Sequence, residues 1–145
     1  MNILGTSNAL TSYLLSVAIT DIDASDISWS NTEYEPSGKD AWLDVWFNPV
    51  GANSTTKHAV VGQQEVGFFQ ISVYVPLNDL TNNVVNYANR QLQIITDVLN
   101  AFAPNTLIEH DDVKVSITNS NITSPRKAGG WYVRDITINY IKLGE

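Results

Sequence analysis

The sequence predicts an α+β domain in which an antiparallel or mixed β-sheet is covered on one face by two helices. A wide apolar stripe recurs every three to four residues between about 84 and 102, as in a long amphipathic helix. Residues 41–47, 66–75 and 131–141 alternate in polarity, as strands do. The order helix, strands, long helix, strands is typical of an α+β architecture.

The chain opens with an expected N-terminal helix, for which Ser7 or Thr6 can serve as the cap. Its apolar positions are spaced to share one helical face, and they are Leu10, Tyr13, Leu14, Val17 and Ala18. An acidic, polar segment follows from residue 21 to 40, interrupted by a short strand at 27–29. Residues 33–40 have turn chemistry throughout, and the sequence assigns the segment no role.

Two strands are expected next, and a polar excursion from Gly51 to Gln64 separates them. The first covers 41–47 and the second about 65–75, with a further short strand at 57–61 inside the excursion. In the first strand Leu43, Val45 and Phe47 share one face, and Trp42, Asp44 and Trp46 share the other. Pro76 ends the second strand because it has no N–H to donate.

The clearest element is the helix from about Val84 to Phe102. Its central apolar stripe comprises Val85, Ala88, Leu92, Ile95, Leu99 and Phe102. Five neighbours, Val84, Tyr87, Ile94, Val98 and Ala101, widen the stripe to about half the circumference. Because this arc exceeds what one sheet contact needs, part of it is expected to meet the first helix or a neighbouring subunit. Strands at 107–109, 113–119 and 131–141 complete the fold.

Composition limits the classes of function. A chain of 145 residues can bury a core as one domain, and without cysteine it has no disulfide or thiolate site. The net charge is −7, and only Arg126 and Lys127 are adjacent among the eight basic residues, so a nucleic-acid reader is not expected. Residues 1–5 lack the features of a signal peptide, and no apolar run approaches the ~18 residues of a membrane span, which predicts a soluble protein. Four tryptophans and six tyrosines favour an interface protein weakly.

No enzyme signature is found, and no catalytic, cofactor or metal-binding residue is assigned. The run Glu109–Asp112 is the densest group of candidate cation ligands, but it lacks the spacing of a calcium loop, and a solvated turn is the preferred interpretation. His58 has no partners for a catalytic triad, and residues 62–67 lack the lysine of a phosphate loop. The carboxylates within 21–35 could act on a sugar, or form a carbohydrate-binding surface with tryptophan, but a solvated loop is again preferred.

Three stretches resemble a family of short phage tail proteins that is grouped with the lambda-type tail terminators and minor tail proteins. They are residues 41–49 (AWLDVWFNP), residues 66–76 (VGFFQISVYVP) with the helix that follows, and residues 129–140 (GGWYVRDITINY). Each pattern is moderately specific, and their order and spacing cover nearly the whole chain past residue 40. The acidic segment 21–40 is the main departure from the family.

The resemblance implies one α+β domain over residues 1–145 that assembles as a hexameric ring. That ring caps the tail tube, stops its polymerisation and presents a surface to the head. The implied partners are further copies of the chain, the tail-tube protein and a head-completion or connector protein. The resemblance also implies that DNA passes through the ring without specific binding, and that neither a cofactor nor a membrane is involved. It further implies that the protein is assembled in the host cytoplasm into the virion tail or neck. The alternatives are another neck, head–tail joining or tail-tube protein and, from a different class, a carbohydrate-binding β-rich module.

Seven residues are candidates for the subunit or tube interface. Trp42 and Trp46 lie on the less apolar face of their strand, where they could anchor a contact, although core positions are equally compatible. Lys57 and His58 lie in the polar excursion, which could form an arm that reaches a neighbour or the tube. The apolar arc of the long helix contributes Tyr87, Ile94 and Val98.

Overall fold

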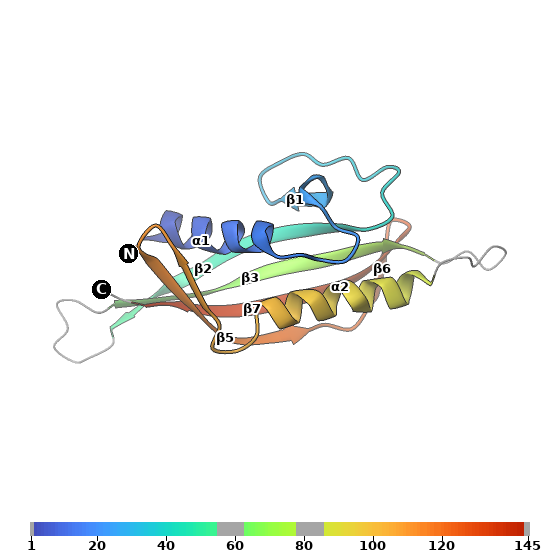
Figure 1. Cartoon of the computed structure of the whole chain (residues 1–145). Coiled ribbons are helices and arrows are strands. Elements are labelled where there is room, and N and C mark those ends of the chain that lie inside the picture. Colours follow the sequence, from blue (N-terminus) through green and yellow to red (C-terminus); the bar gives the residue numbers. More distant parts are fainter. Residues whose placement is uncertain (1, 55–62, 78–85, 144–145) are drawn as a thin grey trace.

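The computed structural model describes residues 2–54, 63–77 and 86–143, and this part of the chain forms two helices and a seven-stranded mixed sheet (Figure 1). The mixed α+β class predicted from the sequence is therefore confirmed. The elements are α1 (Ile3–Ser16), a 3₁₀ turn (Ala24–Asp26), β1 (Ile27–Trp29), β2 (Trp42–Ser54), β3 (Gln63–Pro76), α2 (Tyr87–Ala101), β4 (Leu107–His110), β5 (Val113–Ile122), β6 (Arg126–Ala128) and β7 (Trp131–Lys142).

The strands lie in the order β1-β2-β3-β7-β5-β4, and β6 pairs with β7 beyond the end of β5. Strand β1 runs parallel to β2, whereas the other pairs in the described residues are antiparallel. The long strands β2, β3 and β7 form the centre of the sheet, and β3 pairs with β7 from Glu65 to Pro76. One edge of the sheet is therefore β1 with part of β2, and the opposite edge is formed by β4, part of β5, and β6.

Both helices pack on one face of the sheet, where the core lies. The buried cluster combines residues of α1 and α2 with alternate residues of the central strands. The helices also meet each other, because the Tyr13 hydroxyl donates a hydrogen bond to the Ala101 carbonyl at 2.7 Å. The Tyr13 and Phe102 rings meet edge to face at 5.1 Å, and Phe102 lies 6.0 Å from the Phe69 ring of β3.

Helix α1 begins earlier than the sequence predicts. Asn2, and not Thr6 or Ser7, is the N-cap, because its side-chain oxygen accepts a hydrogen bond from the Gly5 N–H at 2.9 Å. Thr6 is instead buried, and its hydroxyl donates to the Glu65 carboxylate of β3 at 3.0 Å. The Asn2 N–H donates to the same carboxylate, so Glu65 fixes the first turn of α1 against the sheet.

Helix α2 is shorter than the predicted helix, and its buried face is displaced by about one residue. It begins at Tyr87 after the N-cap Asn86, and residues 84 and 85 lie outside the described part of the chain. Leu92, at the centre of the predicted stripe, is 44% exposed, whereas the polar residue Gln91 is fully buried. The Gln91 side-chain amide donates to the carbonyls of Val73 at 3.0 Å and Tyr132 at 3.1 Å. An apolar periodicity could not identify this residue, because its burial depends on hydrogen bonds to the sheet.

Strands β2 and β3 extend into the region predicted as a polar excursion. Their pairing continues to Ser54 opposite Gln63, with a register shift between Pro49 and Gly51. The part between them, including the short strand predicted at 57–61, lies outside the described residues. Gly67 stands next to the register shift, where an added Cβ would lie 2.5 Å from the Asn48 carbonyl oxygen. A side chain at residue 67 therefore does not fit against β2.

Candidate functional site

An aromatic row crosses the sheet on the face opposite the helices. Trp42 of β2 stacks on Tyr74 of β3 with ring centroids 4.0 Å apart, and Tyr34 stacks against Trp42 at 5.1 Å. Trp131 meets the Trp42 ring edge to face at 5.8 Å. Trp42 is consequently only 8% exposed. Its ring is covered within its own subunit, so it is not available to stack on a sugar ring or to contact a neighbouring subunit.

This row also attaches the acidic segment 21–40 to the sheet. Tyr34 belongs to the segment, and its hydroxyl donates to the Ser25 carbonyl at 3.1 Å. Burial raises the pKa of the Tyr34 hydroxyl, and burial likewise raises the pKa of Tyr74. Both phenols are therefore neutral over the ordinary pH range, and the row is held by ring stacking and hydrogen bonds.

Local hydrogen bonds and ion pairs order the rest of the segment. Asp23 caps the 3₁₀ turn by accepting from the Ser25 N–H at 2.9 Å, and the hydrogen bonds from Ser25 lower the pKa of its carboxyl. Lys39 lies 2.7 Å from Asp26, and this hydrogen bond raises the pKa of the lysine. Most carboxylates of the segment are exposed, as in a solvated loop, and these local contacts give it a defined path along the surface of the subunit.

Arg90 joins the acidic segment to α2. Its guanidinium lies 3.4 Å from Asp21 and 3.9 Å from Asp40, and it also stands 5.6 Å from the centre of the Tyr87 ring. The two carboxylates are at the two ends of the segment, so one arginine ties both ends to the helix. These exposed pairs contribute little individually, and their effect is to set the path of the chain.

The opposite edge of the sheet carries basic side chains on β6. Arg126 pairs with Asp135 of β7, and the Ser72 hydroxyl donates to the other oxygen of that carboxylate at 2.6 Å. The hydrogen bond to Asp135 raises the pKa of Arg126. Lys127 is exposed and lies beside a hollow of about 270 Å³ that Pro76, Leu77, Ala88 and Tyr132 also line.

The structure places the remaining predicted interface residues in different environments. Trp46 is 45% exposed, and its indole N–H donates to Asp44 at 3.0 Å, so its ring is accessible. Tyr87 is half-buried at the start of α2. Ile94 and Val98 are fully buried against the sheet, which corrects their assignment as contact residues: this part of the apolar arc is used inside the subunit. Lys57 and His58 lie outside the described residues.

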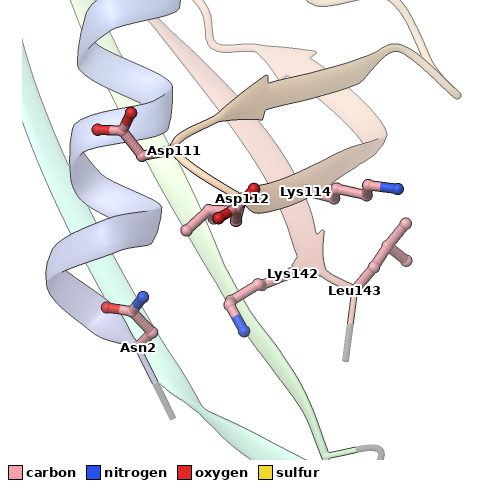
Figure 2. Close-up of a pocket in the computed structure, with 7 residues that line it drawn as sticks. Asn2, Asp111, Asp112, Lys114, Lys142 and Leu143 are labelled. Atoms are coloured by element: carbon pink, nitrogen blue, oxygen red, sulfur yellow. The ribbon is translucent and has the colours of Figure 1, made fainter. Parts of the chain in front are cut away.

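The hairpin between β4 and β5 borders a polar hollow of about 270 Å³, lined by Asn2, Asp111, Asp112, Val113, Lys114, Lys142 and Leu143 (Figure 2). Figure 2 shows the carboxylates of Asp111 and Asp112 pointing in different directions. Both residues have positive φ, at 46° and 65°, as the tight turn requires. Across the described ranges no three acidic, histidine or cysteine side chains gather as a metal site would need. The run Glu109–Asp112 is therefore a strained turn in this structure.

Two buried polar residues were not identified from the sequence as structural positions. Glu65 is 4% exposed, and Gln91 is fully buried. The strand alternation did contain a signal for Glu65: residues 65, 67 and 69 share one face of β3, and Phe69 places that face toward the helices. Both residues hold a helix to the sheet, and neither is open to a ligand.

Comparison with known proteins assigns the family. A family model described as "Phage tail terminator protein" matches residues 6–140, which include most of α1, the whole of α2 and nearly all of the sheet. A search of curated proteins finds no match. One solved structure superposes with a TM-score of 0.62 at 16% sequence identity, covering 94% of this chain and 94% of that chain, and this likeness concerns the fold alone.

This family consists of structural, non-enzymatic tail proteins. None of the helices in the described residues is long and apolar enough to cross a membrane. The resemblance inferred from the three sequence stretches is confirmed by the match over the bulk of the chain. The chain belongs to the phage tail terminator family and is a structural protein of the virion tail.

Proposed function

We propose that this chain forms a closed homo-oligomeric ring, expected to be a hexamer, that caps the tail tube. The ring stops polymerisation of the tube and presents the surface to which the head is joined. Its partners are further copies of the chain, the tail-tube protein and a head-completion or connector protein. The observation that carries the proposal is the family match over residues 6–140.

The architecture of the sheet supports a ring. A ring built head to tail needs two different patches on each subunit, one donor and one acceptor. The helices occupy one face of the sheet, and its two edges differ in the described residues: β1 and β2 form one, and β4, β5 and β6 form the other. Such a subunit offers two chemically distinct sides to its neighbours.

Charge supports the passage of DNA without specific binding. The chain carries a net charge of −7. Two of its basic groups on the described surface, Arg126 and Lys39, are paired with carboxylates of the same subunit. A protein that releases counterions from DNA needs several free cations along one stripe. A neutral to acidic ring lets the genome pass without holding it.

The test is the mass of the purified protein across a concentration series, with electron microscopy of the largest species. The proposal expects discrete closed rings at high concentration or on tail tubes. Open-ended tubes would instead identify a tail-tube subunit. Rings that bind an isolated connector but never a tube end would identify a neck protein. A monomer at every concentration, with no binding to tubes, would contradict the proposal, and glycan-dependent tryptophan quenching would then point to the carbohydrate-binding alternative.

A further inference from the structure

We propose that the acidic segment 21–40 of one subunit docks against the basic β6 edge of the next subunit. This inference rests on the proposed ring and names its contact surfaces. The acidic edge is defined here as residues 21–40. The basic edge is defined as Arg126 and Lys127 together with the hollow beside Lys127.

The charge of the chain is divided between the two edges. Residues 21–40 contain six carboxylates and one lysine, which gives this segment a net charge of −5 in a chain whose net charge is −7. Residues 113–134 contain four of the eight basic residues and no carboxylate. The sheet separates these two groups, because the first is attached beside β1 and β2, and the second includes β5, β6 and the start of β7. Complementary surfaces of this kind steer association and fix its register.

The two edges lie at the same level along the strands. Arg126 pairs with Val133, Val133 with Tyr74, and Tyr74 with Trp42. Tyr34 of the acidic segment continues this row, because it stacks on Trp42. In Figure 1 the acidic segment and β6 both lie in the half of the molecule away from the chain termini. Neighbours placed side by side without a shift along the strands would therefore bring the two edges together.

Each edge offers a charge that has no partner among the described residues of its own subunit. Glu33 and Lys127 are exposed, and within the described ranges neither side chain makes a hydrogen bond or an ion pair. Because three interstrand spacings, about 14 Å in total, separate β2 from β6, the two edges of one subunit are too far apart to pair with each other. The hollow of about 270 Å³ beside Lys127 gives the incoming segment a recess. A second copy of this chain supplies, at each edge, the opposite charge that the edge lacks.

The test uses charge reversal and its rescue in the full chain. We expect Lys127→Glu and Glu33→Lys each to raise the protein concentration at half-assembly roughly tenfold, because each places like charges at the contact. The double variant restores opposite charges at every contact of the ring and should return to within about threefold of the wild type. Lys114→Glu is the matched control, since this exposed lysine lies at the other end of the strands, and it should change assembly by less than about twofold. Circular dichroism melts establish that each variant is folded.

The outcomes separate this inference from the proposed ring. If the wild type forms rings, but Lys127→Glu behaves like Lys114→Glu or the double variant assembles no better than the single variants, the docking surfaces are wrong and the ring function stands. If the wild type forms no closed species in solution or on tail tubes, both are overturned. The expected result is loss of assembly in each single reversal and recovery in the double variant.

Discussion

Removing the Tyr34 side chain should release the acidic segment from the sheet. Tyr34→Ala eliminates the stack on Trp42, where the ring centroids are 5.1 Å apart, and the hydrogen bond to the Ser25 carbonyl. An aromatic pair contributes about 0.5–1.5 kcal/mol beyond its area, and a hydrogen bond contributes about 0.5–1.5 kcal/mol. The free energy of unfolding should therefore fall by about 2 kcal/mol, and Tyr34→Phe, which keeps the ring, should lose under about 1 kcal/mol.

Urea unfolding followed by circular dichroism measures the loss of stability. Digestion with a glutamyl endopeptidase measures release of the segment, since the peptide bond after Glu33 is its candidate cleavage site, whereas Pro36 protects the bond after Glu35. Tyr34→Ala should be cut within the segment well before the remainder of the chain, while Tyr34→Phe should resemble the wild type. Equal stability of the alanine and phenylalanine variants, or unchanged cleavage in Tyr34→Ala, would refute the argument that ring stacking holds the segment.

Three further predictions concern the fold. Gln91→Ala removes the side-chain amide that donates hydrogen bonds to two strand carbonyls, and it should lower the free energy of unfolding by about 2–3 kcal/mol in a urea titration. The neighbouring variant Leu92→Ala changes a 44% exposed position and should lower it by less than about 1 kcal/mol. Asp112→Gly should raise the melting temperature by relieving a φ of 65°, a gain of about 0.5–1 kcal/mol, and a lower melting temperature would contradict the strain. Burial raises the pKa of Tyr140 to about 12. The contribution of the neutral phenol to the free energy of unfolding is therefore complete below the ordinary tyrosine pKa of 10.0 and is lost as the pH rises toward 12. The urea midpoint should fall over that pH range, and it should fall less steeply in Tyr140→Phe.

The elements with strong periodicity were predictable from the sequence. Alternation in β3 and β7 reflects a sheet with one buried face, and β7 was predicted to within one residue at its end. The boundaries failed where a polar side chain decides them. Helix α1 starts at Ile3 because Asn2 caps it, and a candidate cap four or five residues later looked equally suitable from sequence alone.

The candidate contact surface was only partly predictable. Part of the apolar arc of α2 was expected to meet the first helix or a neighbouring subunit, and Ile94 and Val98 were chosen as contact residues, yet both are fully buried in the core of their own subunit. Trp42 lies on the less apolar face, as expected, but Tyr34 covers it. The role of Tyr34 could not be seen in the sequence, since residue 34 reaches residue 42 only through the path that the acidic segment takes around the edge of the sheet.

The most direct test of the proposed function is the length of tail tubes grown with and without this protein. Purified tail-tube subunits of the same phage are allowed to polymerise, the protein is added during growth, and tube lengths are measured by electron microscopy. The account predicts that growth stops on addition and that a ring of this protein is visible at one end of each tube. Continued growth, with the protein bound along the tubes or not bound at all, would contradict a terminator.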